Sequence, residues 1–216
     1  MDEDAFDQAL IGAAFNLAAE HGWRQMTIAG AARAADLSLA RARARFPHRA
    51  AVLLRFGRLA DQAALAELSA DGPVRDRLFD LIMRRIDTLQ AHRAGVLAVM
   101  RALPGEPATA LLLACATRRS MRWFLHAVGV GTAGVRGELK LRGLVGVWLW
   151  TLRRWERDES SDLSTTMASL DSALSRAERA VRWLYGGPRG EAPEKEPPES
   201  AEHPADTEAP PENPSP

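Results

Sequence analysis

The sequence predicts an all-α protein, built from an N-terminal three-helix unit that contains a helix-turn-helix and a larger helical body. Apolar residues recur at helical spacing through the first 187 residues, and no segment alternates apolar and polar residues as a half-buried strand does. Eight arginines lie between residues 24 and 58, where Asp36 is the sole acid. These features indicate a helical fold with a strongly basic region near its start.

The first helix is predicted from one apolar face. Phe6, Leu10, Ala14 and Leu17 follow each other at spacings of three and four residues, which places them on one side of a helix. Gly22 is the kind of residue that ends a helix. We therefore expect the first helix to end near residue 22.

Two short helices follow, and each begins after a capping residue. Thr27 can accept a hydrogen bond from the first turn of a helix over 28–34, and Ser38 can do the same for a helix over 39–46. Pro47 ends the second of these helices. Together they predict the helix-turn-helix.

The body is predicted to contain six further helices, separated by segments rich in glycine, proline and polar residues. Their expected ranges are 49–69, 73–92, 95–103, 108–128, 135–157 and 163–184.

The C-terminal segment 188–216 has the composition of a disordered tail. It holds nine of the thirteen prolines, eight acids and two bases. The remaining 26 basic and 20 acidic residues lie in 1–187, so the neutral total conceals a basic protein. We expect three domains: the helix-turn-helix unit at 1–50, the helical body at 51–187 and the tail.

The helix over 39–46 is expected to present arginines to a polyanion. Successive residues advance by about 100°, so Leu39, Ala42 and Phe46 are expected to pack inward. Arg41 is then the candidate for base contact in a major groove, and Arg43, Arg45 and Arg49 are candidates for phosphate contact. The residues expected at double-stranded DNA are Thr27, Ser38, Ala40, Arg41, Arg43, Ala44, Arg45 and Arg49.

This region resembles the DNA-binding motif of the TetR family of transcriptional regulators. The positions in register with the family pattern are Gly22, Thr27, Ala32, Ala35, Ser38, Phe46 and Arg49. Asp36 departs from the pattern, because it stands at a turn position that is usually glycine. Arg43 and Arg45 also depart from it, since they replace a tyrosine and a histidine that often contact phosphate.

The resemblance implies a dimeric regulator with a ligand pocket in its body. In the family the last two helices form a four-helix bundle across a two-fold axis, which sets two recognition helices about one DNA turn apart. The large side chains Met100, Met121, Trp123 and Trp148 are expected to pack in the core or at the dimer interface, or alternatively to line the cavity for a small apolar ligand. The dimer contacts would be Leu144, Trp148, Leu152, Trp155, Leu170 and Leu174.

A second resemblance leaves an alternative function open. Residues 147–178 are similar to the C-terminal part of the lipid-binding accessory protein of ubiquinone biosynthesis, which has a TetR-like fold and is not a repressor. On that alternative, the body binds a lipid and the chain does not bind DNA. A helical scaffold with neither role is a third possibility.

Other classes of function find no support in the sequence. The five histidines and Cys115 show no metal-ligand spacing, and neither a nucleophile elbow nor a P-loop is present. We therefore expect no enzyme activity, no cofactor and no metal. No signal peptide and no membrane-spanning run is found, so a cytoplasmic protein without stable membrane insertion is expected.

Overall fold

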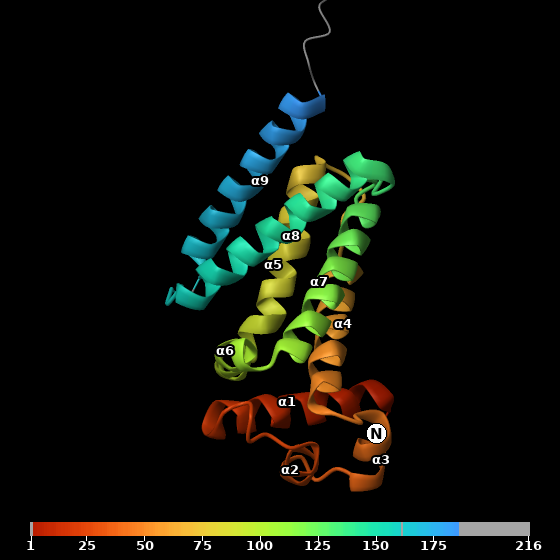
Figure 1. Ribbon diagram of the computed structural model, residues 1–216, viewed down its shortest axis with the longest axis vertical. Helices are drawn as coiled ribbons and strands as arrows, with labels where there is room; N and C mark the ends of the chain where they lie inside the picture. Colours follow the sequence, from red (N-terminus) through yellow and green to blue (C-terminus); the bar gives the residue numbers. More distant parts are fainter. Residues whose placement is uncertain (1, 161, 186–216) are drawn as a thin grey trace, which may run out of the picture.

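The computed structural model describes residues 2–160 and 162–185, and Figure 1 shows that these residues form an all-helical molecule. No strand occurs in this part of the chain, so the predicted all-α class is confirmed. The elements are α1 (Glu3–His21), α2 (Ile28–Ala34), α3 (Leu39–Arg45), α4 (Arg49–Ala66), α5 (Val74–Gln90), α6 (Arg93–Ala102), the 3₁₀ turn η1 (Leu103–Gly105), α7 (Pro107–Ala127), α8 (Gly134–Arg157) and α9 (Ser164–Tyr185). The tail predicted for 188–216 lies outside the described residues.

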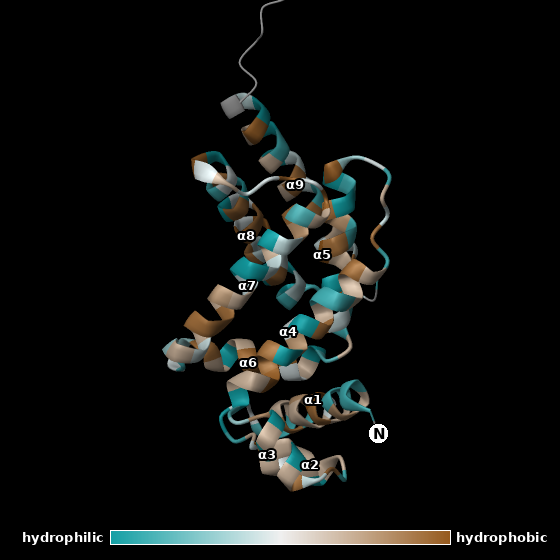
Figure 2. Ribbon diagram, turned by 90° about the vertical axis from the view of Figure 1, so that its right-hand side faces the viewer, coloured by the Kyte–Doolittle hydropathy of each residue, from teal (hydrophilic) through white to brown (hydrophobic). Residues whose placement is uncertain are grey.

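The helices divide between two ends of an elongated molecule. Figures 1 and 2 agree that α1, α2 and α3 lie together at one end, while α4 to α9 extend away from them. Within the body, α4 packs along α5 and α7, and α8 packs along α9. The two ends meet where α6 packs along α1. The basic helix-turn-helix is therefore a distal feature of the molecule.

The helix limits follow the sequence signals, with small differences at the ends. The helix expected to reach residue 69 ends at Ala66, and Pro73 precedes α5 as its N-cap with an extended backbone. Proline is compatible both with the N-cap observed here and with the first helical position expected from the sequence. The backbone N–H that it lacks would make no hydrogen bond within the helix at either position.

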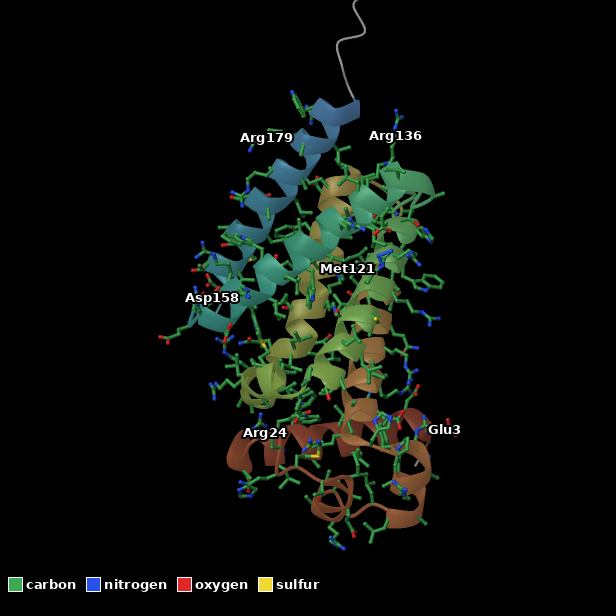
Figure 3. The ribbon with its side chains drawn as sticks, in the orientation of Figure 1. Glu3, Arg24, Met121, Arg136, Asp158 and Arg179 are labelled. Carbon is green, nitrogen blue, oxygen red and sulfur yellow. The ribbon has the colours of Figure 1, made fainter. Side chains whose placement is uncertain are left out.

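A single carboxylate holds the start of α9. The Oδ2 atom of Asp158 accepts hydrogen bonds from the backbone N–H and the hydroxyl of Thr166, both at 2.7 Å. Burial alone would raise the pKa of Asp158, but the hydrogen bonds from Ser160 and Thr166 lower it to about 2. Asp158 therefore stays ionised and fixes the corner between α8 and α9, which is labelled in Figure 3.

The contact between α1 and α6 has no room for an extra atom at Gly95. A Cβ placed there would lie 2.5 Å from the backbone oxygen of Phe15. The ring of Phe15 also packs on Phe56 and His92, with centroid distances of 4.7 and 5.3 Å. Burial between these rings lowers the pKa of His92. This contact, which we call the α1–α6 seam, joins the two ends of the molecule through close packing.

Among the described helices, none is by itself long and apolar enough to cross a membrane. Residues 93–105 and 107–127 meet the length and composition criteria together, but they are bent by 119° at their junction.

Substitution of Gly95 by alanine should loosen the α1–α6 seam. The added methyl group would overlap the backbone of Phe15, so we expect Gly95→Ala to lower the free energy of unfolding by about 1–3 kcal/mol. Thermal denaturation followed by circular dichroism measures the change. Gly12→Ala is the matched control on the other side of the same seam. Its Cβ would lie 3.8 Å from His92, an ordinary contact, so its stability should equal or exceed that of the wild type.

Candidate functional site

The turn between α2 and α3 has the local geometry that the sequence predicts. The backbone N–H of Gly30 donates to the Thr27 hydroxyl at 3.0 Å, and that of Arg41 donates to the Ser38 hydroxyl at 3.3 Å. Both predicted caps are therefore confirmed. Asp36 has a φ of 51°, in the left-handed region where the family pattern has glycine. Aspartate tolerates this conformation better than most residues, which explains how the turn forms without glycine.

The exposed face of α3 differs from the predicted one at Leu39, which was expected to pack inward. Ala42 and Phe46 are buried as expected, but Leu39 is 44% exposed because Leu37, in the preceding turn, fills the core instead. Ala40, Arg43 and Ala44 are also exposed. We call Leu39, Ala40, Arg43 and Ala44 the outer face of α3. It combines one cation with three apolar side chains.

Arg41 and Arg43 differ in where their guanidinium groups lie. Arg41 is half-buried, lies 4.3 Å from the ring centroid of Phe6, and donates to the backbone oxygen of Asp2 at 3.3 Å. Arg43 is exposed and donates to the backbone oxygen of Pro47 at 2.9 Å. The structure therefore makes Arg43, rather than Arg41, the more accessible arginine on α3.

The inner side of α3 is held by a buried carboxylate. Asp7 of α1 is buried and accepts hydrogen bonds from Arg45 of α3 and from Arg55 of α4. Nη1 of Arg45 also lies 2.9 Å from the carboxylate of Glu3, and Nη2 of Arg55 lies 2.7 Å from the carboxylate of Asp4. Figure 3 shows Glu3 beside α3. We call these five residues the Asp7 cluster.

The electrostatics of the Asp7 cluster stabilise its charged form. Burial alone would raise the pKa of Asp7, but the hydrogen bonds and charges of Arg45 and Arg55 outweigh burial and lower it. The bond to Asp7 likewise raises the pKa of Arg45. Because the guanidinium of Arg45 is already bound by Asp7 and Glu3, the structure does not support the predicted phosphate contact of this residue. Arg45 instead positions α3.

Arg49 also lies away from the outer face of α3. It donates to the backbone oxygen of Arg24 at 2.7 Å and to Glu106, at the start of α7, at 3.1 Å. Its expected contact with phosphate is therefore not supported, because its guanidinium joins the N-terminal unit to the body.

The body contains a cavity of about 300 Å³ lined by residues of α1 and α4 to α8. A groove between α4 and α7 adjoins this inner cavity and has a volume of about 720 Å³. Of the residues predicted to bind a ligand, Met100 and Trp148 line the inner cavity and Trp123 lines the groove. Met121 lines neither space, because it is completely buried in the core on α7. Its position is labelled in Figure 3.

A buried ion pair, which the sequence pattern does not predict, separates the inner cavity from the groove. Arg85 of α5 lies 2.6 Å from Asp61 of α4, which also accepts a hydrogen bond from Ser120. Burial raises the pKa of Asp61, and the charge of Arg85 opposes this rise. One feature of the sequence does indicate that Arg85 is buried: it lies between Ile82 and Leu89, within the apolar stripe of its helix.

Most of the residues predicted at a dimer interface are buried inside the single chain. Trp155 and Leu170 are completely buried, and Trp155 donates its indole N–H to Gln90 at 2.8 Å. Leu144, Trp148 and Leu174 are buried as well, and Leu152 lines the inner cavity. This prediction is corrected because these apolar side chains form the core between α5, α8 and α9. The exposed residues of α8 and α9 include Gly146, Trp150, Ala168 and Ser172.

Within residues 2–160 and 162–185, no group of three or more His, Cys, Asp or Glu side chains could hold a metal ion.

Comparison with known proteins identifies the fold. No family model and no curated protein matches the chain. The solved TetR transcriptional regulator from Nitrosomonas europaea ATCC 19718 has a TM-score of 0.68 and 23% identity, over 82% of this chain and 99% of that one. A TetR-family regulator from Streptomyces coelicolor has a TM-score of 0.59 and 22% identity, over 85% of each chain. One from Rhodococcus sp. RHA1 has a TM-score of 0.56 and 16% identity, over 82% and 97%.

The chain therefore has the fold of TetR-family transcriptional regulators, as its helix-turn-helix motif predicts. The three neighbours are all described as transcriptional regulators.

Replacement of Asp7 by asparagine should destabilise the protein near neutral pH, because it leaves two arginines without their shared carboxylate. We expect a loss of about 3 kcal/mol in the free energy of unfolding, measured by urea denaturation. The folded-state pKa of Asp7 is below its unfolded value near 3.8, so its stabilisation is present above that pH and is lost as the pH falls through the folded-state pKa. The difference between wild type and variant should therefore shrink below about pH 4.

Asp4→Asn is the control for this experiment, because Asp4 binds Arg55 with an exposed carboxylate. We expect it to change the stability by less than about 1 kcal/mol. A loss for Asp7→Asn no larger than that for Asp4→Asn would contradict the role of the Asp7 cluster.

Proposed function

We propose that this chain, which has the fold of TetR-family regulators, is a DNA-binding transcriptional regulator that acts as a homodimer and responds to a small apolar or amphipathic effector. One observation carries the proposal. The second helix of the helix-turn-helix is fixed from its inner side by the Asp7 cluster, and it presents the outer face of α3 to the surroundings.

The chemistry of this outer face suits the major groove of DNA. Arg43 is exposed and can donate several N–H groups to guanine or to phosphate. Ala40, Ala44 and Leu39 are apolar and suit contact with thymine methyl groups. Arg33 on α2 is exposed and makes no ion pair with a described residue, so it is a further candidate for phosphate contact. Thr27, Ser38 and Arg41 flank this surface and stay candidates for the backbone.

The dimer is proposed to form through the exposed side of α8 and α9. Trp150 is 44% exposed there, and Gly146, Ala168 and Ser172 are small enough to let two helix pairs approach closely. Large aromatic residues at the centre of an interface contribute much of its binding energy. Trp150 is therefore the residue on which we expect dimer stability to depend most.

The inner cavity is the proposed effector site. Its wall includes Phe15 of α1, so a bound molecule would touch a helix that also carries the Asp7 cluster. A molecule bound there could change the orientation of the helix-turn-helix unit. Extraction and mass spectrometry of molecules that copurify with the protein would also test the alternative, which predicts a bound lipid in a protein that does not retard DNA.

A charge reversal at Arg43 should abolish specific DNA binding. Glutamate at this position would repel phosphate and could not donate to a base, so we expect the affinity for duplex DNA that flanks the chain's own gene to fall by about 100-fold or more. Fluorescence anisotropy at several salt concentrations measures this loss, and wild-type log affinity should decrease linearly with log salt.

Arg122→Glu, at an exposed site on α7, makes the same charge change away from the helix-turn-helix. It should keep the affinity within about twofold of wild type, because distant exposed charges are screened at physiological salt. Equal losses in the two variants would refute a specific role for α3.

A charge placed at Trp150 should dissociate the dimer. We expect Trp150→Glu to elute as a monomer at micromolar concentrations at which the wild type is a dimer, as measured by light scattering after size-exclusion chromatography. Trp123→Glu is the matched control, because Trp123 is exposed on α7 and lies outside the exposed side of α8 and α9. If the Trp150 variant remains dimeric, the interface lies elsewhere.

A further inference from the structure

Arg85 is the main polar feature of the wall that separates the inner cavity from the groove. Its side chain comes from the middle of α5 and is only 6% exposed as a residue. Both spaces are lined by Arg85 together with Leu53, Gly57, Leu113 and Thr117, so they adjoin at these residues. A molecule that extends from one space into the other would pass the guanidinium group.

One edge of the Arg85 guanidinium, formed by Nε and Nη2, has no hydrogen-bond acceptor among the described residues. Nη1 lies 2.6 Å from the carboxylate of Asp61, and the flat face of the group lies 4.7 Å from the ring centroid of Trp148. Nε and Nη1 are both buried and make no hydrogen bond with a described residue, although Nη1 forms the ion pair with Asp61. Nη2 lies beside Gly57, 4.0 Å from where a Cβ of that residue would stand. Buried donors without a partner are rare in folded proteins. This edge is therefore a place where a bound acceptor would remove an energetic cost.

The surroundings of Arg85 favour an elongated molecule with one anionic end. Apart from Arg85 and Thr117, the inner cavity is lined by apolar residues, including Phe56, Leu89 and Val99. Its volume of about 300 Å³ is at the lower end of the range for small-molecule sites. The adjoining groove carries Arg58 and Arg119 beside Asp61. With Arg85 included, three positive charges face one negative charge, so an anion is attracted to this entrance.

We propose that the inner cavity binds an acyl-chain carboxylate, whose chain lies among the apolar residues and whose carboxylate accepts hydrogen bonds from the Nε–Nη2 edge of Arg85. Arginine and carboxylate form two parallel hydrogen bonds with this geometry. Asp61 and Trp148 hold the guanidinium in position before the ligand arrives. The inference rests on the proposed function only in treating this molecule as the effector, since binding itself does not require DNA.

Calorimetric titration with three ten-carbon amphiphiles tests the head-group preference of the wild-type protein. Decanoate carries the proposed head group, 1-decanol is neutral, and decyltrimethylammonium is cationic. Hydrogen bonds to a charged group predict that decanoate binds at least about tenfold more tightly than 1-decanol, and that the cationic amphiphile binds more weakly than both. Equal affinities for decanoate and decanol, or no binding of either, would overturn the proposal.

A double variant tests the contribution of the ligand's head group. Asp61→Asn combined with Arg85→Met removes both charges of the pair, so that neither is left buried alone. In this double variant the affinities for decanoate and decanol should differ by less than about twofold, while decanol binds as in the wild type. Arg122→Met, which removes an exposed arginine outside both spaces, should keep the wild-type preference for decanoate.

Gly57→Leu tests the position of the chain without changing any charge. Gly57 lines both spaces, and a Cβ there would lie 4.0 Å from Nη2 of Arg85. A leucine side chain would therefore obstruct the junction of the two spaces, so decanoate and decanol should both lose at least about tenfold in affinity. Circular dichroism establishes that each variant is folded. A decanoate preference that persists in the double variant, or unchanged binding in Gly57→Leu, would place the ligand elsewhere.

DNA binding on the same preparations distinguishes this inference from the proposed function. If the protein binds DNA specifically but shows no preference for decanoate, the ligand inference fails and the regulator proposal stands. If the protein prefers decanoate but does not bind DNA, the regulator proposal fails and the ligand inference stands. A decanoate-dependent change in DNA affinity, lost in the double variant, would support both.

Discussion

The buried carboxylate of Asp7 is the constraint on which the arrangement of the N-terminal helices depends. It lies between Arg45 of α3 and Arg55 of α4, and a buried charge is tolerated only when it is paired. The helix α3 must therefore turn Arg45 toward α1. Because successive residues advance by about 100°, this orientation turns Arg43 toward the opposite side. The exposure of Arg43 is thus a consequence of where Asp7 lies.

The helix α1 takes part in both proposed activities. One part of it supplies Asp7 to the cluster that orients α3, and another part supplies Phe15 to the wall of the inner cavity. The close approach of Gly95 to Phe15 leaves little freedom between α1 and α6. A change in the cavity that displaces Phe15 would therefore act on α1 as a whole, because a helix moves nearly as a rigid body. This shared helix is a physical route between the cavity and the helix-turn-helix.

Local features of the fold could be predicted from the sequence because their causes are local. The hydroxyls of Thr27 and Ser38 accept hydrogen bonds from backbone N–H groups only three residues further along the chain. The apolar spacing in each segment likewise marks a helix whatever surrounds it. The charged pairs could not be predicted in the same way. Arg45 and Asp7 are separated by 38 positions, and Asp61 and Ser120 by 59, so no spacing rule connects them. The sequence shows that residues 2–7 include four acids, but it does not show which arginines bind them.

The sequence by itself determined the helical class, the caps, the turn with Asp36 and the concentration of arginine near α3. Only the tertiary structure decided which arginines reach the surface and which apolar residues form the core. Helical periodicity places Trp148 and Trp155, seven residues apart, on one face of their helix and Trp150 on another. It does not say which face is buried, because a helix in a bundle has neighbours on several sides. Trp155 is buried against Gln90 while Trp150 is exposed, and the difference depends on where α5 and α9 pack. The physical reason is that burial and ion pairing depend on contacts between distant segments, which are set by the whole fold.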